Sequence, residues 1–410
     1  MTVGSTWSGT YDYTASVLHR PQTIDELRHL VARTPRIRAL GSRHSFTGLA
    51  DSHELVSLDR LAPAIEIDAE SETVTVSGGV RYGELGRALQ REGWALRNLA
   101  SLPHISVAGA IATGTHGSGD RNGTLSRTVS GLELVAADGD LLSISPVDSR
   151  FDGAVVSLGA LGIVTRVTLD IEPTYDVRQD VFGGLSWSAL LDNFDSITAR
   201  AYSVSVFTGW TGDTVGTVVM KSRTDAAAPP KALYGRPPFP ADVHPIPEAT
   251  AEAVTPQGGV PGPWIDRLPH FRLDFEPSFG EELQSESLVP RRHAVSAIEA
   301  VRALGATLAP HLHISELRTV AADSLWLSGA YETDVLGIHF TFRREPDAVA
   351  TLLPVIEEAL APFDARPHWG KAFHSVRREL YPRLDDFVAL ATELDPQGKF
   401  RNDFLDRYVF

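Results

Sequence analysis

Residues 38–46 form the stretch of the sequence with the clearest potential for chemistry. They read Arg-Ala-Leu-Gly-Ser-Arg-His-Ser-Phe, a short apolar strand followed by a sharp turn. Gly41 accepts positive φ angles and Ser42 can hydrogen-bond its own main chain, so successive N–H groups can form a concave surface that suits a phosphate. His44 follows the turn, where its ring can face the bound group. Taken alone, the segment is more typical of a turn with a surface histidine.

A second segment, residues 99–119, changes that balance. It reads Leu-Ala-Ser-Leu-Pro-His-Ile-Ser-Val-Ala-Gly-Ala-Ile-Ala-Thr-Gly-Thr-His-Gly-Ser-Gly. Its small residues have too little bulk to fill a core, but they let a backbone approach a ligand closely, and Ser101, Ser106, Thr113 and Thr115 add hydroxyl groups. A flexible Gly/Ser linker is the alternative. Linkers do not usually carry Ile, Val, Leu and two His, so we predict a ligand-binding segment.

The two segments together resemble the FAD-binding domain of the vanillyl-alcohol oxidase-type flavoproteins. In that family a Gly-Ser-x-His-Ser turn and a later Ser-Val-Ala-Gly…Thr-Gly-Thr-His-Gly segment wrap the FAD diphosphate. The chain resembles the alditol (xylitol) oxidases along nearly its whole length, including Arg-Pro-His-Trp-Gly-Lys at 366–371. The resemblance implies FAD joined covalently to His44. Arg43 stands where many members have Gly, and we interpret it as a tolerated variant.

The resemblance also implies which residues contact the cofactor. They come from residues 38–46 and 99–119, which we call the first and second glycine-rich segments, from one strand near the adenine, and from the C-terminal half. They are Ala39, Leu40, Gly41, Ser42, Arg43, His44, Ser45, Ser101, Ser106, Gly109, Thr113, Gly114, Thr115, His116, Val164, Arg318, His368 and Lys371.

Four polar residues lie at alternating positions on two predicted strands. Glu316 and Arg318 are two residues apart on one strand, and His339 and Thr341 are two apart on the next, so each pair points to one face. An exposed face with a cross-strand ion pair is an equally good interpretation of the pattern alone. The neighbours Leu317, Ile338, Phe340 and Phe342 suit a buried opposite face, which favours a polar wall that faces a ligand.

The family resemblance implies that this wall lies over the flavin ring and binds polyol hydroxyls, with Ser101 and Thr341 among the substrate-binding residues. We expect hydride transfer from the terminal carbon to flavin N5. Arg318 and Lys371 would stabilise the developing oxyanion, and Glu316 would hold the adjacent hydroxyl. His339 is a candidate proton acceptor, although the sequence leaves the acceptor open. Dioxygen would then reoxidise the flavin, giving hydrogen peroxide and an aldose.

Three alternatives compete with an alditol oxidase. A flavin dehydrogenase of a polyol or aldonolactone would keep the cofactor and use an acceptor other than oxygen. A metal-dependent hydrolase would use the face-sharing pair His311-x-His313, followed by His339, His368 and His374, but spacing alone is a weak motif. A non-catalytic sugar-binding protein would not need His44, Glu316, Arg318 and Lys371. We expect no metal site.

Composition narrows the class of protein further. The 410 residues carry a formal charge of −15, which disfavours nucleic acid and anionic membranes as partners. There is no cysteine, which excludes disulfides, thiolate ligands and a flavin attached to Cys. No apolar run reaches the length of a membrane span, and no secretory signal is visible. We expect a cytoplasmic monomer whose partners are a small polyol and dioxygen; xylitol, sorbitol and related polyols cannot be ranked.

The predicted elements give an α+β fold of two domains, a vanillyl-alcohol oxidase-type (PCMH-type) FAD-binding domain and a substrate (cap) domain with an antiparallel sheet. We place the FAD-binding domain at residues 1–173 and the cap domain at 174–365, with a return to the first domain over 366–410. Prolines are dense between 222 and 270, which indicates an ordered excursion or lid. No Gly-x-Gly-x-x-Gly follows a strand, so the pattern disfavours a Rossmann fold and NAD.

Overall fold

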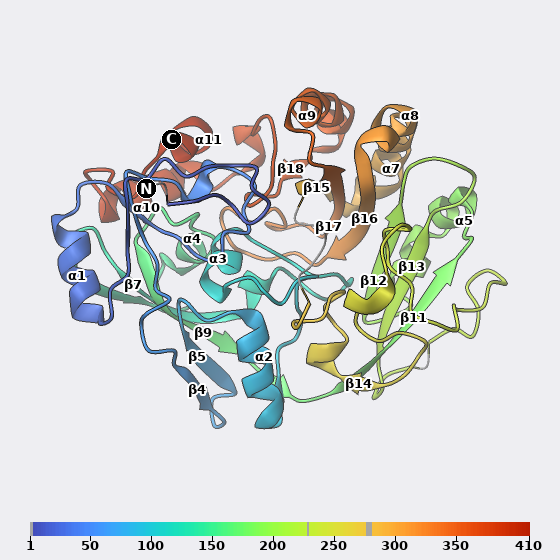
Figure 1. The fold of residues 1–410 in the computed structure, drawn as a ribbon, viewed down its shortest axis with the longest axis horizontal. Helices are drawn as coiled ribbons and strands as arrows, with labels where there is room; N and C mark the ends of the chain where they lie inside the picture. The colour runs from blue at the N-terminus through green and yellow to red at the C-terminus, as the bar shows by residue number, and fades with distance from the viewer. Residues whose placement is uncertain (1–2, 228, 276–280) are drawn as a thin grey trace.

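A computed structural model describes residues 3–227, 229–275 and 281–410. Two large antiparallel sheets lie side by side and organise the molecule (Figure 1). The N-terminal half holds a five-stranded sheet in the order β4 (Ile65–Asp68), β5 (Thr73–Ser77), β9 (Ile163–Asp170), β7 (Val129–Val135) and β8 (Leu141–Ile144). Next to it, a small parallel sheet contains β1 (Val17–His19), β3 (Glu54–Val56) and β2 (Ile37–Ala39), and β6 (Trp94–Ala95) pairs with β10 (Glu172–Pro173).

The N-terminal half contains four α-helices among the described residues. They are α1 (Ile24–Arg33), α2 (Tyr82–Arg91), α3 (Val107–Ala112) and α4 (Phe151–Val155), with short 3₁₀ turns η1 (Gly48–Ala50) and η2 (Leu125–Thr128). Thr23 caps α1 by accepting a hydrogen bond from the Glu26 amide. The Glu26 carboxylate accepts from the Gln22 amide at 2.7 Å, one residue before the cap, so the reciprocal bond of the capping box is displaced.

The second sheet has eight strands. Their order is β14 (Gly262–Pro263), β11 (Asp176–Gly183), β13 (Thr217–Arg223), β12 (Ser203–Thr208), β16 (Leu312–Val320), β17 (Val335–Arg343), β15 (Glu282–Pro290) and β18 (Arg366–Pro367). The helical segments of this half are α5 (Trp187–Asp192), α6 (Phe194–Thr198), α7 (Ala294–Ala303), α8 (Gly305–Leu308) and α9 (Pro346–Leu360), with η5 (Arg291–His293), η6 (Ala309–His311) and η7 (Ala361–Phe363).

One face of the eight-stranded sheet is apolar and the other is polar. Leu317, Ile338 and Phe340 pack into a core with residues of α7 and α9, such as Ile298 and Ile356. Because side chains alternate along a strand, the polar residues between them project to the opposite face. That face turns toward the N-terminal half, as the lining of the shared cavity described below shows.

The end of the chain packs against the N-terminal half. After η8 (Arg378–Leu380), helices α10 (Leu384–Leu394) and α11 (Asp403–Tyr408) contribute Phe387 and Leu405 to the same apolar core as Val74 and Val167 of the five-stranded sheet. Figure 1 shows these red helices and both termini on the same side of the molecule. We keep domain boundaries at 173 and 365 as a proposal for how the chain divides.

Two strands of the eight-stranded sheet, β11 and β15, were not predicted from the sequence. The ordered excursion was predicted. The excursion is ordered over the described residues 222–270 and contains β14, η3 (Ala251–Ala253) and η4 (Trp264–Asp266). Among the described residues, no helix combines the length and apolar character that crossing a membrane requires.

The prediction that His311 and His313 share one strand face, as a metal hydrolase would need, was wrong. His311 lies in η6, and the pairing register of β16 shifts between Leu312 and Ile314, so His311 and His313 do not share a regular strand face. His311 instead forms an ion pair with Glu345 at 2.5 Å. The irregular start of β16 therefore separates two residues whose spacing suggested a common ligand.

Candidate functional site

One cavity of about 680 Å³ is lined by both halves of the molecule. Of the predicted site residues, all except Gly114 line it. The N-terminal half contributes the two glycine-rich segments and Val164, and the C-terminal half contributes the polar sheet face with His368 and Lys371. The structure thus brings together residues that lie more than 300 positions apart in the chain.

The two glycine-rich segments contact each other at Ser106. The Ser42 hydroxyl accepts a hydrogen bond from the Ser106 amide at 3.0 Å. A Cβ atom added to Gly41 would lie 2.7 Å from Ser106 Oγ, and one added to Gly109 would lie 2.8 Å from the same atom. A side chain at either position would force the Ser106 hydroxyl to move, so glycine favours this contact between the two segments.

His44 lies beside this contact and has an unusual environment. Both of its ring nitrogens are buried without a hydrogen-bond partner in the chain. The ring stacks on Trp7, with centroids 5.4 Å apart and planes inclined by 17°. Burial lowers the pKa of His44 to about 4, because a charged ring would lose its hydration. The imidazole is therefore neutral at physiological pH, and its lone pair is not used by the protein.

The polar wall forms on three neighbouring strands. Glu316 of β16 lies opposite His339 of β17, which lies opposite Glu286 of β15. Arg318 Nη2 donates to Glu286 Oε1 at 2.8 Å, and Arg318 Nη1 lies 3.4 Å from the Ser101 hydroxyl. The wall is thus held in register by main-chain ladders, and its arginine reaches the second glycine-rich segment.

Glu286 is the site residue that the sequence analysis missed. Its carboxylate is fully buried, 2.8 Å from Lys371 Nζ and 3.3 Å from His116 Nε2. Burial alone would raise its pKa, but Arg318 and Lys371 outweigh that effect and hold the pKa well below its usual range. The available signal was the alternation Glu282-x-Gln284-x-Glu286, whose three polar side chains all line the cavity.

His339 connects Lys371 to Thr341. Lys371 Nζ lies 2.7 Å from His339 Nδ1, and His339 Nε2 lies 3.0 Å from the Thr341 hydroxyl. If the ammonium group donates to Nδ1, then Nε2 carries the proton and donates to Thr341. Both ring nitrogens then have partners, so the ring is placed to orient Thr341. The predicted role of His339 as proton acceptor stays a prediction.

Comparison with known proteins places this arrangement in a family. The FAD binding domain family matches residues 15–145, and the family described as D-arabinono-1,4-lactone oxidase matches residues 281–408. An alditol oxidase from a Streptomyces species is 48% identical, over 98% of each chain. The chain belongs to the alditol oxidase family of vanillyl-alcohol oxidase-type flavoproteins.

Two more distant proteins are also similar to this chain. An L-gulono-1,4-lactone dehydrogenase from Mycobacterium tuberculosis is 29% identical over 99% of each chain. A cholesterol oxidase from B. sterolicum has the same fold, with a TM-score of 0.78 at 14% identity over 99% of this chain and 96% of that chain. The predicted fold of an FAD-binding domain with an antiparallel cap sheet is confirmed.

The residues of this alditol oxidase family member fit FAD. Gly41 and Gly109 line the cavity, which both halves of the molecule enclose. His44 Nδ1, His44 Nε2 and Arg318 Nε are buried polar atoms without hydrogen-bond partners in the chain. Because buried polar groups in proteins are nearly always satisfied, these atoms indicate a missing partner in the cavity. FAD is therefore assigned as the cofactor on the family match and on this fit.

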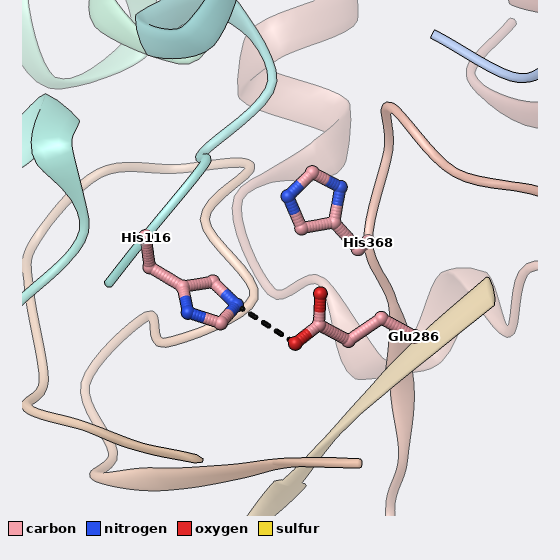
Figure 2. A group of neighbouring side chains, drawn as sticks. All are labelled: His116, Glu286 and His368. Atoms are coloured by element: carbon pink, nitrogen blue, oxygen red, sulfur yellow. Dashed lines mark ion pairs between the residues drawn. The ribbon is translucent and has the colours of Figure 1, made fainter. Parts of the chain in front are cut away.

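His116, Glu286 and His368 form the one group of potential metal ligands among the described residues, with ligand atoms within 4.8 Å of one another. Figure 2 shows both rings beside the Glu286 carboxylate. That carboxylate already has two cationic partners, Arg318 and Lys371. A divalent cation would add charge to a site whose negative charge is already compensated. We therefore interpret the group as part of the polar wall.

The excursion contributes His270, which the sequence analysis also missed. Its Nε2 lies 3.0 Å from Glu316 Oε1, and its main-chain amide donates to the Ser101 carbonyl at 3.2 Å. The ring contacts Phe207 edge to face at 5.2 Å. His270 therefore ties the excursion to both the predicted substrate-binding carboxylate and the second glycine-rich segment.

Burial lowers the pKa of His270 from 6.5 to about 4, and Lys221 adds to this effect. Between these values only the unfolded chain binds the proton, so stability is present above pH 6.5 and is lost as the pH falls. For this residue we expect a loss of about 2 kcal/mol between pH 7.5 and pH 5.

Urea unfolding of wild type and His270→Gln at both pH values would measure this contribution. Glutamine keeps a donor toward Glu316 and does not titrate, so the pH-dependent loss should be smaller in the variant by that amount. An identical pH dependence in both proteins would contradict the prediction.

Proposed function

We propose that the protein oxidises the terminal hydroxyl of alditols such as xylitol and sorbitol, with FAD as cofactor and dioxygen as electron acceptor, giving an aldose and hydrogen peroxide. The observation that carries the proposal is one cavity that contains both His44 and the polar wall. The 48% identity to an alditol oxidase over nearly the whole chain supports the same reaction.

The wall offers both hydrogen-bond acceptors and hydrogen-bond donors to the hydroxyl groups of a polyol. Glu316 can accept hydrogen bonds from hydroxyl groups, because its carboxylate is held ionised by Arg318 and His270. Arg318 and Lys371 offer fixed cationic donors to the hydroxyl oxygen that loses its proton. Thr341, whose oxygen lies 3.0 Å from His339 Nε2, can accept from the ring and donate its own hydrogen to the substrate.

FAD, when bound, supplies the two-electron acceptor for this oxidation. The residues of the chain would exclude water and fix the alcohol relative to it. Burial lowers the pKa of Lys371, while Glu286 opposes this effect. An ammonium group in such a low-dielectric environment interacts strongly with a developing alkoxide, which is a far better hydride donor than the alcohol.

We include covalent attachment of FAD to His44 in the proposal. A neutral, unpartnered imidazole is the form that can make a new carbon–nitrogen bond. In the balanced reaction, the imidazole N–H and one flavin methyl C–H each lose a hydrogen. Dioxygen accepts the two protons and two electrons as hydrogen peroxide.

His44→Ala is expected to abolish covalent attachment. Acid precipitation of purified wild type should give a yellow pellet, whereas the variant should release all of its flavin to the supernatant. We expect at least a 20-fold lower ratio of pellet to total flavin absorbance, about the detection limit of such a measurement. A yellow variant pellet would contradict the role of His44.

The substrate and the electron acceptor can be tested together. Hydrogen peroxide release should be measured with xylitol, sorbitol and glycerol, and with an aldono-1,4-lactone as comparison. A flavin dehydrogenase of polyols or lactones is the second candidate, because the lactone oxidase family matches residues 281–408. Such a dehydrogenase would reduce an artificial dye and form little hydrogen peroxide.

The proposal also includes that the protein is a cytoplasmic monomer. Sedimentation of the purified protein would test its oligomeric state.

A further inference from the structure

The first residues of the described chain form a strap across the turn that precedes His44. We call residues 3–14 the N-terminal strap. It is anchored through Asp51, whose carboxylate accepts from the Tyr11 hydroxyl at 2.8 Å and from the Thr14 hydroxyl at 2.8 Å. Farther along, the Gly9 carbonyl accepts from Arg344 at 2.7 Å, so the strap also contacts the end of the cap sheet. It is therefore held at several points.

Arg43 fastens the strap directly to the turn that precedes His44. Its Nη1 donates to the Val3 carbonyl at 3.0 Å and lies 3.3 Å from the Ser5 carbonyl. The Trp7 amide donates back to the Arg43 carbonyl at 2.8 Å. The guanidinium carbon also lies 5.5 Å from the centre of the Tyr13 ring. Strap and turn are thus joined by both main-chain and side-chain contacts.

Arg43 has an unfavourable backbone conformation, which its side-chain contacts offset. Its φ is +63°, a left-handed conformation that costs a residue with a side chain about 1–2 kcal/mol. Glycine would adopt this angle without that cost. The arginine side chain offers in return a hydrogen-bonding clamp that glycine lacks. The arginine side chain therefore has a local structural role.

Trp7 is the strap residue that touches His44. The two rings are stacked at 5.4 Å, and the imidazole nitrogens lack a well-formed hydrogen bond, although the Ser42 main chain interacts with the ring. Stacking and burial therefore contribute strongly to its orientation. The covering indole also removes water from one side of the ring. Both effects favour an uncharged imidazole held at one angle toward the cavity.

We propose that the N-terminal strap is a positioning device for covalent flavin attachment, in which Trp7 orients the His44 ring and Arg43 holds the strap on the turn. The inference rests on the proposed attachment to His44 described above. The chemical step is unchanged: one C–N bond forms, an N–H and a C–H bond break, and dioxygen takes up both electrons and protons. Trp7 and Arg43 take no part in bond making and act only through His44.

The rate of attachment is the decisive measurement. Apoprotein produced under riboflavin limitation is mixed with FAD, and acid-precipitated samples report the covalent fraction over time. We expect Trp7→Ala to slow attachment at least tenfold and Trp7→Phe, which keeps a stacking ring, to stay within about threefold of wild type. Trp94→Ala, at a half-buried tryptophan outside the cavity, should attach FAD at the wild-type rate.

Dependence on pH separates positioning from loss of structure. Wild-type attachment should be independent of pH between 8 and 5, because the ring stays neutral. In Trp7→Ala the uncovered ring should protonate more easily than in wild type, although His104 and Arg81 still lower its pKa, so attachment should slow further as the pH falls from 8 to 5. A variant that is merely less well folded would show a lower amplitude with an unchanged pH profile, and that result would overturn the proposal.

Arg43→Gly tests the clamp without a backbone penalty. Glycine relieves the left-handed strain, so stability should change little, yet the loosened strap should slow attachment severalfold. Attachment at the wild-type rate in both Trp7→Ala and Arg43→Gly would overturn the role of the strap while leaving His44 as the attachment site. A wild-type pellet without flavin would instead overturn covalent attachment itself, and the strap proposal with it.

Discussion

Lys371→Met is expected to lower kcat for xylitol by about 10²–10³-fold, the cost of removing one fixed donor from a site that stabilises an oxyanion. Lys371 Nζ lies between Glu286 and His339, at 2.8 and 2.7 Å, so its position is set by two partners on neighbouring strands. Methionine fills a similar volume without the charge. The effect should therefore arise from the missing ammonium group and not from a cavity.

Flavin content and substrate affinity show whether the lysine acts in the chemical step. The variant should retain its acid-stable flavin, and KM should change by less than about tenfold if the lost interaction is made mainly in the transition state. Anaerobic reduction by xylitol, followed by flavin absorbance, should slow by the same factor as turnover. If flavin reduction proceeds at the wild-type rate, Lys371 is not the group that stabilises the alkoxide.

Glu286→Gln is expected to have the largest combined effect on stability and activity. The carboxylate compensates Arg318 and Lys371 in a fully buried environment, and removing one partner of a buried ion pair typically costs about 3–5 kcal/mol. Without it the two cations repel each other, and Lys371 would lose its proton more easily. Turnover should fall by at least about 100-fold even where the variant remains folded.

Glu282→Gln supplies a matched control on the same face of β15. Burial raises the pKa of Glu282 to about 7, so at pH 6 this side chain is mostly protonated and resembles glutamine. The substitution should cost less than about 1 kcal/mol at that pH. Urea unfolding and xylitol oxidation of both variants at pH 6 would compare them. Equal effects at the two positions would show that Glu286 has no special role.

Local signals were enough to predict much of the site. The turn before His44 and the small-residue segment each carry their own glycine and hydroxyl pattern, and strict alternation on β16 and β17 identified the wall. Alternation also marks Glu282, Gln284 and Glu286 as one face of a strand, but it does not show that this strand pairs between β17 and β18, which is what brings Glu286 into the site. Nothing near Glu286 in the sequence indicates that Arg318 and Lys371 will surround it.

Trp7 and His270 were missed for a related reason. Each lies in a segment without regular periodicity, and its importance comes only from what it covers. Trp7 reaches His44 across the N-terminal strap, and His270 reaches Glu316 from the proline-rich excursion. Aromatic and imidazole rings in such segments are common on ordinary surfaces, so their types alone do not indicate a site.

The ion pairs around the polar wall have a consequence for substrate selection. Glu286 and Glu316 balance Arg318 and Lys371, and burial keeps the neighbouring imidazoles His339 and His368 uncharged. An anionic sugar, such as a phosphate ester or an aldonate, would bring an uncompensated charge into this enclosure and would lose its hydration on entry. We therefore expect the wall to select uncharged compounds before it distinguishes hydroxyl patterns.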